Sequence, residues 1–386
     1  MARISRIYLI GNGASIPNGS PYSKNLLIKS FFIFCNTQDS NEKARFKECF
    51  QSLFSMMQKI DCKEKWKQYK KKLENYSICN DVEKNEIENE LSKLYIWDIL
   101  VQIKDYWNSQ NYIPWFHDEQ NKKIIIRKEY NDIGWLTVLT IYKSLKNKTS
   151  QIYKNFIAKI SKIKQDNFII INLNYDNLLE NEVWPNLKQN KNLFINGFAQ
   201  KDNITIYKPH GGFDFILCKK CNKISYRQNF NIFSIRHNGL RKCLYCGIPH
   251  NWNYFIPYTD VEFEKQLAEF EKNQQANAQQ NNKLIIKYED RWKIIENIIC
   301  KMKKDIPENI PITTIGYSFS KSKNSLIDAH LKDIFKNRKV YIVAKDFKES
   351  KEIADRLRNE EKIDACDTQF NSFKDYVNHL WIDLHM

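Results

Sequence analysis

The stretch IYLIGNGASIP, from Ile7 to Pro17, sets the fold that we expect for this chain. Four apolar residues, Ile7 to Ile10, run directly into Gly11-Asn12-Gly13-Ala14-Ser15. An apolar run that ends on glycines is typical of a buried strand before a sharp turn, where the backbone can approach a phosphate closely. The N–H groups of such a turn favour an anion. An ordinary strand-to-helix turn has the same pattern, so this motif alone does not separate the two.

Further strand-like segments follow and alternate with helical patterns. They are FIIINL (168–173), ITIYKPHGG (204–212), ITTIGYSFS (312–320) and KVYIVAKD (339–346). The first of these, Phe168 to Leu173, is apolar and β-branched, which indicates a strand buried on both faces of a parallel sheet. Alternation of strand and helix predicts an α/β fold, with a parallel sheet covered by helices.

A long helical region separates the first strand from the second. Its clearest pattern is DVEKNEIENELSKLYIWDILVQIKDYW (81–107), where Ile87, Leu91, Leu94 and Ile99 fall near one helix face. We therefore expect a large helical insertion within a discontinuous sheet domain. The expected divisions are 1–30, 166–217 and 311–386 for the sheet domain, 31–165 for the insertion, 218–257 for a zinc module and 258–310 for a helical or loop segment.

The chain is strongly basic, with a formal net charge of +16 over 386 residues. Part of the excess lies in KEKWKQYKKK, Lys63 to Lys72. A solvated helix face explains such a run, and a groove for nucleic acid is the alternative. No nucleic-acid recognition motif accompanies it.

No apolar run reaches the length of a membrane span, and the four apolar residues before Gly11 are too few for a signal peptide. We therefore expect a cytoplasmic protein. Six of the ten cysteines are scattered, as is usual for reduced thiols in that compartment.

The other four cysteines form a metal-binding pattern. Cys218 and Cys221 make one Cys-x-x-Cys pair, and Cys243 and Cys246 make another after 21 intervening residues. Two such pairs can close a tetrahedral four-thiolate site for Zn²⁺. Since four thiolates leave no position open for water, the sequence predicts a structural zinc ribbon without catalytic duty.

Polar residues follow the expected strands at their carboxyl ends, where parallel sheets bind ligands. Asn174 and Asp176 follow the FIIINL strand. His210 lies in the chain between that strand and the cysteine pairs. A histidine can act as a general base near neutral pH. Capping of the next helix explains Asn174 and Asp176 equally well, and a lone histidine is more often structural.

The last two strands carry weaker candidates. Gly316 and Ser318 form a second glycine turn after a strand, and Asp346 ends the KVYIVAKD segment. An acidic residue at such a strand end can bind ribose hydroxyls, although a surface loop also explains it.

The order of these motifs resembles the sirtuin family. The resemblance covers residues 5–18, 168–180, 204–257 and 311–346, and its most specific part is a zinc ribbon soon after the His-Gly pair. It implies a Rossmann-like NAD-binding domain that carries the zinc module.

By family roles, the resemblance implies the following functions for residues of this chain. Gly11, Gly13, Ala14 and Ser15 would hold the NAD phosphates, and Gly316 and Ser318 would line the adenosine side, with Asp346 a weaker addition. Asp176 would contact the nicotinamide carboxamide. Asn174 would hold the ribose or the attacking water, and His210 would be the general base.

Three departures separate this chain from the protein-deacylating sirtuins. No Phe-Arg pair follows the glycine turn, Asn172 and Leu173 replace the usual Thr-Gln, and the expected Phe-Gly-Glu is absent from IPYTDVEFEK (256–265). These features, with the helical insertion, resemble the sirtuin-like proteins of bacterial antiviral defence, which hydrolyse NAD or are controlled by a second defence protein.

We therefore expect an NAD glycohydrolase that depletes NAD in antiviral defence, with NAD as substrate and Zn²⁺ as a structural ion. A protein deacylase and a non-enzymatic subunit that binds nucleotides or nucleic acid are the alternatives. Because uncontrolled hydrolysis would harm the host, we expect regulation by assembly as a homo-oligomer or with a partner, such as a HerA-type ATPase or an Argonaute-like protein.

Overall fold

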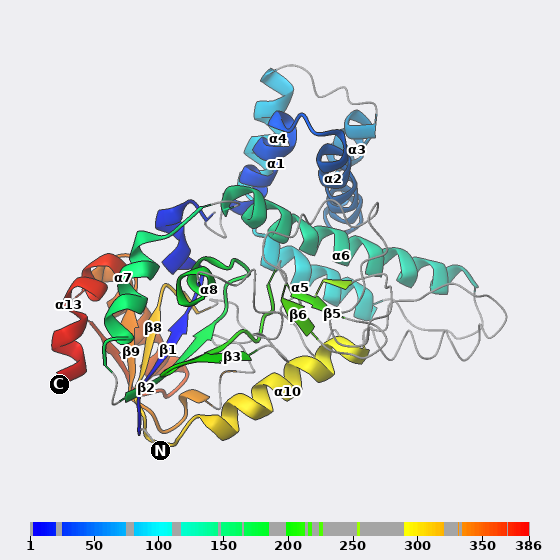
Figure 1. Ribbon diagram of the computed structural model, residues 1–386. Coiled ribbons are helices and arrows are strands. Elements are labelled where there is room, and N and C mark those ends of the chain that lie inside the picture. Colours follow the sequence, from blue (N-terminus) through cyan, green and yellow to red (C-terminus); the bar gives the residue numbers. More distant parts are fainter. Residues whose placement is uncertain are drawn as a thin grey trace. The chain divides into compact units, whose positions relative to one another are not determined.

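The computed structural model describes the backbone of this chain outside a set of gaps (Figure 1). These gaps are residues 1–2, 21–24, 75–80, 110–116, 146–147, 164–165, 185–197, 213–214, 218–223, 227–252, 255–288, 320–330, 332–333, 369 and 386. Contacts divide the chain into two compact units. The sheet unit comprises Met1–Ser20, Asn147–Asn231 and Ile235–Met386, and the helical unit comprises Pro21–Lys146 and Ile232–Ser234.

A seven-stranded, mostly parallel sheet forms the centre of the sheet unit. Its order in the described residues is β10-β9-β8-β1-β2-β4-β3. The strands are β1 (Arg3–Ile10), β2 (Asp166–Asn172), β3 (Phe198–Lys201), β4 (Ile204–Tyr207), β8 (Ile312–Ile315), β9 (Val340–Val343) and β10 (Ala365–Asp367). The α/β class and the five strands expected from the sequence are confirmed, and the arrangement is consistent with a Rossmann-like fold.

Two edge strands were not expected from the sequence. β3 pairs antiparallel with β4, across a turn in which Asp202 has a φ of 50°. β10 pairs parallel with β9 over Ala365 to Asp367 alone. Both segments are short, so an apolar run long enough to signal a strand is missing from each.

The central strands are buried on both faces, because helices and neighbouring strands enclose them. Ile7 to Ile10 of β1 have no exposed surface. Tyr8 meets Phe156 of α7 (Gln151–Ile160) edge to face, with ring centroids 5.0 Å apart. Phe156 in turn meets Phe373 of α13 (Phe373–His385) at 5.7 Å. This aromatic series packs α7 and α13 over one face of the sheet (Figure 1).

Four other helical segments complete the described part of the sheet unit. They are the 3-10 helix η1 (Asn12–Asn18), α8 (Leu178–Val183), α10 (Glu289–Asp305) and α12 (Phe347–Glu360). η1 follows β1 directly, and α8 follows β2 after five residues, so both begin at the carboxyl edge of the sheet. α12 packs on β9 and β10.

The strand order reverses between β1 and β8. From β1 the chain continues to β2 on one side, and it returns to β8 on the other. At this switch point the Gly13 N–H donates to the Gly316 carbonyl at 2.7 Å. Gly316 has a φ of +62°, and a Cβ there would lie 2.5 Å from the Gly13 carbonyl carbon and closer still to the Ala14 nitrogen. Both glycine turns predicted from the sequence therefore meet each other, and neither position 13 nor 316 has room for a side chain.

Gly316→Ala is expected to lower the free energy of unfolding by about 2 to 4 kcal/mol, because it adds a left-handed alanine to a backbone overlap. The measurement is the midpoint of urea unfolding. Ser318→Ala, in the same turn and exposed, is the control and should change the free energy by less than about 0.5 kcal/mol. Equal unfolding midpoints for Gly316→Ala and wild type would contradict the close contact.

The helical unit contains six described helices: α1 (Leu26–Asn36), α2 (Ser40–Asp61), α3 (Glu64–Glu74), α4 (Asp81–Ser92), α5 (Ile96–Ser109) and α6 (His117–Leu145). Asp39 begins α2 by accepting the Glu42 N–H at 2.9 Å, and Cys62 ends it in the left-handed conformation, with a φ of 52°. Phe50 and Phe54 of α2 pack at 6.0 Å, and Phe54 stacks on Trp66 of α3 at 5.9 Å. The unit thus has its own aromatic core.

The bounds of this unit differ from the predicted insertion, 31–165. α1 belongs to the helical unit, since its Phe31 meets Phe50 at 5.5 Å. α7 belongs to the sheet unit through Phe156. Both helices have apolar stripes, and the sequence does not say which core each stripe joins.

The helix expected over 81–107 is divided into α4 and α5. The Leu94 N–H donates to the Leu91 carbonyl three residues earlier, which closes α4 with a tighter turn. Ile87, Leu91 and Ile99 are buried as expected, and Leu94 at the break is half-buried.

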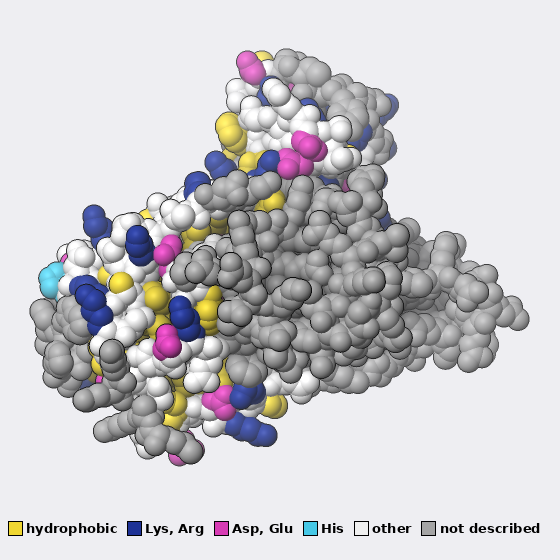
Figure 2. Space-filling model, viewed as in Figure 1, with side chains coloured by type: hydrophobic (Ala, Val, Ile, Leu, Met, Phe, Trp, Pro, Cys, Tyr) yellow, Lys and Arg dark blue, Asp and Glu magenta, His cyan; other side chains and the backbone are white. Residues whose placement is uncertain are grey.

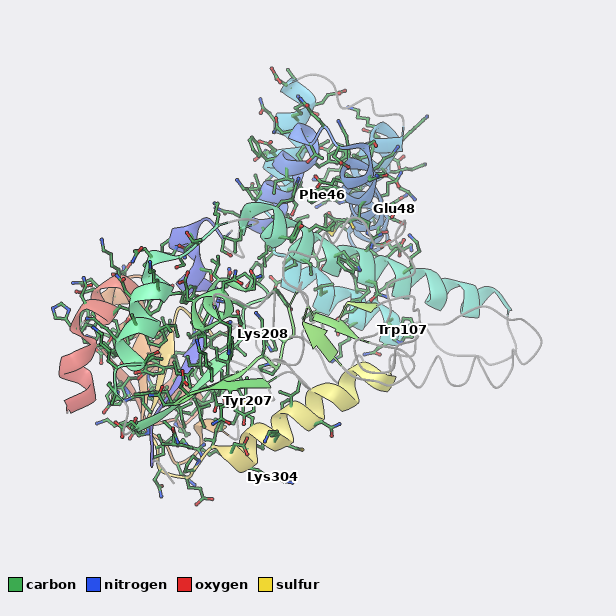
Figure 3. All side chains as sticks on the ribbon, viewed as in Figure 1. Phe46, Glu48, Trp107, Tyr207, Lys208 and Lys304 are labelled. Atoms are coloured by element: carbon green, nitrogen blue, oxygen red, sulfur yellow. The ribbon has the colours of Figure 1, made fainter. Side chains whose placement is uncertain are left out.

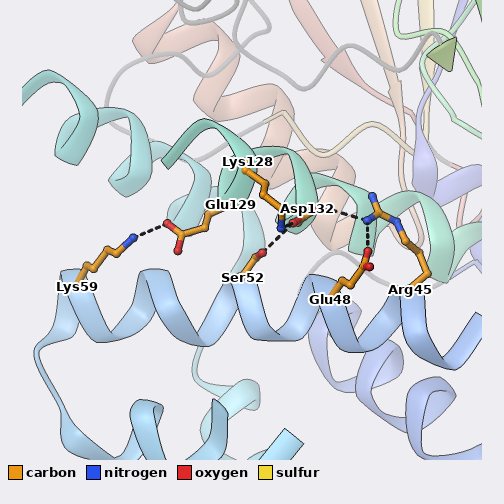
Figure 4. Close-up of polar contacts among 7 residues, drawn as sticks. All are labelled: Arg45, Glu48, Ser52, Lys59, Lys128, Glu129 and Asp132. Carbon is orange, nitrogen blue, oxygen red and sulfur yellow. Dashed lines mark hydrogen bonds and ion pairs between the residues drawn. The ribbon is translucent and has the colours of Figure 1, made fainter. Parts of the chain in front are cut away.

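Buried carboxylates join α2 to α6 (Figure 4). Asp132 accepts from Ser52 Oγ at 2.8 Å and from Arg45 Nη1 at 3.3 Å, and Glu129 pairs with Lys59 at 2.6 Å. Since each carboxylate is paired, these contacts fix the packing of the two helices without leaving a buried charge unsatisfied.

Two further findings concern the described residues only. None of the described helices has the length and apolar composition needed to cross a membrane. Five of the scattered cysteines are described and are free thiols; Cys49 is buried, whereas Cys62 and Cys300 are exposed and so are not core residues.

Candidate functional site

The sequence-predicted polar residues lie along one edge of the sheet. Ile10 pairs with Asn172 on one side and with Ile315 on the other, so the turns after β1, β2 and β8 leave the sheet at the same level. Ile171 pairs with Tyr207, and Asn174 and His210 each follow three residues later. Parallel pairing thus brings the segments that carry Ser15, Asn174 and His210 to the carboxyl edge, where open α/β sheets bind ligands.

Ser15, Asn174 and Tyr153 form a buried hydrogen-bonded cluster at this edge. Ser15 lies in η1, Asn174 follows β2, and Tyr153 lies in α7, which Ser150 caps through the Tyr153 N–H. Ser15 Oγ and Tyr153 Oη are 3.0 Å apart. Asn174 Nδ2 donates to Ser15 Oγ at 3.1 Å and to Tyr153 Oη at 3.3 Å. Burial raises the pKa of Tyr153 well above its usual value, and the nearby charge of Asp176 raises it further.

These contacts leave the carbonyl oxygen of the Asn174 amide as its available atom. Both protons of Nδ2 have acceptors in the cluster, and Oδ1 lies on the other side of the amide. Asn174 Oδ1 is buried, and no described group donates to it. A buried acceptor without a donor costs about 1 to 3 kcal/mol, so the site suits a ligand or water that donates a hydrogen bond.

Asp176 presents a second acceptor of the same kind. Its Oδ1 accepts the Leu178 N–H at 3.1 Å at the start of α8, so the predicted capping role is present. Among the described groups none donates to its buried Oδ2. Burial raises the pKa of Asp176 above its usual value, the Lys208 ammonium lowers it, and the Glu180 carboxylate raises it. Capping thus uses one oxygen of the carboxylate and leaves the other without a described donor.

Lys208, which directly follows β4 and is labelled in Figure 3, belongs to a buried ionic network that the sequence did not reveal. Lys208 Nζ pairs with Glu180 Oε1 of α8 at 3.1 Å and donates to the Asp176 carbonyl. Asn172 Nδ2 also donates to Glu180 Oε1, at 2.7 Å, and Asn172 Oδ1 accepts the Asn174 N–H at 3.0 Å. The network therefore supports the backbone of the Asn174–Asp176 segment.

His210 lies half-buried in the turn after β4. Gly211 has a φ of +63°, so the turn uses the left-handed region that glycine adopts readily. A Cβ at Gly212 would lie 3.0 Å from Lys208 Cε and 3.1 Å from the Tyr175 carbonyl oxygen. The two glycines after His210 are thus explained by the sharp turn and by its close packing against the segment after β2.

The glycine turn after β1 makes backbone contacts inside the protein. The Gly13 N–H is bonded to Gly316, and the Ala14 N–H donates to the Gly11 carbonyl at 3.0 Å. The Gly11 N–H also donates, to the Ile315 carbonyl at 2.8 Å, so three of the N–H groups that the phosphate hypothesis offered to a ligand are already used. Ser15 keeps its predicted place at the site, with its hydroxyl turned toward Asn174.

The candidates after β8 and β9 have structural partners. The Ser318 carbonyl accepts from Arg356 Nη2 at 2.8 Å. Asp346 caps α12, since its Oδ1 accepts the Glu349 N–H at 2.9 Å. Asp346 therefore has a helix-capping role, whereas the sequence offers a surface loop as the alternative to ribose binding, and Ser318 lies in an exposed turn.

The four zinc candidates, Cys218, Cys221, Cys243 and Cys246, lie outside the described residues, and the described residues hold no cluster that could bind a metal. Short strands flank the two pairs. Leu217 of β5 (Phe215–Leu217) pairs with Ile224 of β6 (Ile224–Tyr226), so the connection between them carries the first pair. β7 (Asn253–Tyr254), which follows the second pair, also joins β5.

Residues 64–72 of the basic run lie in α3, and Lys63 directly precedes this helix. Its lysines make ion pairs within the helical unit: Lys63 with Asp61, Lys65 with Glu90, Lys67 with Glu64 and Lys72 with Glu83. On the face shown in Figure 2, Lys and Arg side chains of the described residues are spread out, with acidic side chains among them. These pairings favour a solvated helix face over a nucleic-acid groove.

Sequence reasoning missed Tyr153, Asn172, Glu180 and Lys208. Tyr153 falls in a helical pattern where an aromatic residue normally signals core packing. Lys208 does carry a signal, because a lysine that directly follows a buried apolar strand needs an acidic partner. The identity of that partner, Glu180, depends on the pairing of β2 with β4 and was not accessible.

Comparison with protein-family models gives no match for this chain. Comparison with curated proteins gives no significant match either. The sirtuin resemblance therefore rests on the motifs quoted above.

Asp176→Asn is expected to stabilise the protein at alkaline pH and to have less effect near pH 4. Because the folded pKa of Asp176 is raised, its favourable contribution is present below the unfolded pKa, near 3.8, and is lost as the pH rises through the folded pKa. Lys208, Glu180 and Ser15 face the carboxylate, and all three remain in the variant. The measurement is the difference in Tm between variant and wild type from pH 4 to pH 8.

Asp202→Asn is the control, since Asp202 is exposed on the turn between β3 and β4. A difference in Tm that stays constant with pH for Asp176→Asn, or that changes equally for Asp202→Asn, would contradict the burial effect at Asp176.

Proposed function

We propose that this protein hydrolyses NAD, releasing nicotinamide and ADP-ribose, in antiviral defence by NAD depletion. The observation that carries the proposal is the pair of buried acceptors, Asn174 Oδ1 and Asp176 Oδ2, at the carboxyl edge beside the switch point of a parallel sheet. A nicotinamide riboside end suits such a pair, because it brings carboxamide donors and needs a water whose protons are held.

In this proposal Asp176 accepts a hydrogen bond from the carboxamide and holds the pyridinium ring. Asn174 Oδ1 accepts a hydrogen bond from the attacking water, so a lone pair of that water faces C1′ of the ribose. The new bond joins the water oxygen to C1′, and the bond from C1′ to the pyridinium nitrogen breaks with its electron pair going to nicotinamide. His210, half-buried and three residues beyond the paired end of β4, accepts the proton that the water loses.

Ser15 and Tyr153 act on Asn174 in this mechanism rather than on NAD. Their oxygens accept from Nδ2, and this arrangement leaves Oδ1 facing the water. Preorganisation of this kind removes the cost of orienting the acceptor during the reaction.

The test is an assay of purified protein with NAD, with separation of nicotinamide and ADP-ribose. Asn174→Ala and His210→Ala should each lower kcat by about 100-fold or more. Asn155→Ala and His379→Ala, both exposed on helices of the sheet unit, are the matched controls and should retain activity. An acetylated peptide in a parallel reaction separates hydrolysis from deacylation, because only a deacylase would consume the acetyl group.

Activity that survives both site variants would overturn the assigned residues, and absence of nicotinamide release under every condition would overturn the proposed reaction. The conditions tested must include one in which a protein encoded beside this one is added. We propose that assembly, as a homo-oligomer or with such a partner, controls the activity, and a monomer that is fully active alone would contradict this part.

We also propose one structural Zn²⁺ per chain, held by Cys218, Cys221, Cys243 and Cys246. Purified protein should contain one equivalent of zinc by elemental analysis, and Cys221→Ser should lower both the zinc content and the Tm, since such sites contribute directly to folding. Cys62→Ser, at an exposed free thiol, is the control. Zinc content below about one tenth of an equivalent in freshly purified wild type would contradict the site.

A further inference from the structure

The fully buried ammonium of Lys208 connects the two segments that carry the proposed catalytic residues. Lys208 directly follows β4 and is 1% exposed. Its Nζ donates to the Asp176 carbonyl in the segment after β2 and pairs with Glu180 Oε1 at 3.1 Å. A single side chain from the β4 end is therefore bonded to the backbone of the β2 end.

On the β2 side the contact continues to Asn174. Glu180, whose Oε1 meets Lys208, also accepts from Asn172 Nδ2 at 2.7 Å. Asn172 Oδ1 in turn accepts the Asn174 N–H at 3.0 Å. The backbone at Asn174 and the carbonyl at Asp176 thus have fixed positions with respect to the same ammonium.

On the β4 side the contact continues to His210. The Lys208 carbonyl accepts the Gly211 N–H at 3.0 Å, which closes the turn that contains His210. Gly212 packs so closely that a Cβ there would lie 3.0 Å from Lys208 Cε. The position of His210 therefore depends on how Lys208 is held.

We propose that Lys208 is a positioning residue, which with Glu180 and Asn172 sets the separation of Asn174 and His210 without touching the substrate. This inference rests on the proposed function for its kinetic consequence alone. A buried ion pair is weak evidence for stability, since apolar residues of similar volume often replace one without loss. The ammonium has a property that an apolar side chain lacks, because it donates to two oxygens of different segments at once.

The first experiment follows amide hydrogen exchange in two peptides, one covering residues 172–180 and one covering 207–213. Lys208→Met should raise the exchange rate in both peptides by about tenfold or more, because both segments lose the same anchor. Lys201→Met is the matched control: this exposed lysine of the neighbouring strand β3 donates to the Val183 carbonyl of α8 at 2.8 Å. It should change neither peptide.

The second experiment measures NAD hydrolysis by the same variants. Lys208→Met should lower kcat by about 10- to 100-fold and change KM by less than about threefold, since misplacement of about 1 Å costs the chemical step more than binding. The double variant Lys208→Met with Glu180→Gln removes the carboxylate that the single change leaves unpaired. It should recover most of the lost Tm while kcat stays low.

Recovery of both Tm and kcat in the double variant would overturn the proposal, because the lysine would then serve stability only. Faster exchange confined to residues 207–213, or in neither peptide, would also overturn it. If the wild type does not release nicotinamide, the proposed function fails, and the exchange experiment still decides whether Lys208 couples the two segments.

Discussion

The parallel pairing of β1 on both of its edges is the constraint on which the rest of the sheet unit depends. Its neighbours, β2 and β8, come from more than 150 residues away in sequence, yet they pair with it in register. Parallel strands cannot be joined by a hairpin, so their connections must leave and return, and all of them begin at the same edge. That geometry collects the turns after β1, β2, β4 and β8 at one place. It also requires the Gly13 and Gly316 backbones to touch, because the two turns leave adjacent strands together.

The carboxyl edge departs from the pattern of a fully satisfied interior. Asn174 Oδ1 and Asp176 Oδ2 are buried acceptors to which no described group donates, and burial raises the pKa of Asp176. Both features cost stability, and a protein tolerates such costs mainly where a ligand offsets them. Around these two atoms lie Ser15 and Tyr153, whose side-chain oxygens are hydrogen-bonded to each other, and the Lys208–Glu180 pair, in which Glu180 Oε1 is bonded and no described group donates to Oε2. The unsatisfied acceptors at the carboxyl edge support the proposal of a ligand site there.

The helical unit is stabilised by aromatic packing and by paired carboxylates. Its core is a series of aromatic contacts, including Phe31 with Phe50 and Phe54 with Trp66, and its buried carboxylates are all paired at the described α2–α6 contact. Its charged stretch is largely offset by acidic neighbours on the same unit. These described contacts all lie within the helical unit.

The sequence predicted the buried strands well, because uninterrupted β-branched runs such as Phe168–Leu173 have few other stable arrangements. It predicted the glycine turn and the polar residues after the strands, since glycine and Asn or Asp have specific backbone uses at these positions. It was less successful with short strands such as β10 and with the bounds of the insertion, where α1 and α7 each have an apolar stripe and only contact with Phe50 or Tyr8 assigns them.

The sequence by itself determined the α/β class, the central strands and the carboxyl-edge location of Asn174, Asp176 and His210, because local composition and strand polarity are enough to fix them. Only the tertiary structure decided which atoms of those residues remain available. Tyr153 lies on a distant helix, and Lys208 meets Glu180 only because β4 pairs with β2, so the partners that orient Asn174 and anchor Asp176 come from long-range packing that no local pattern records.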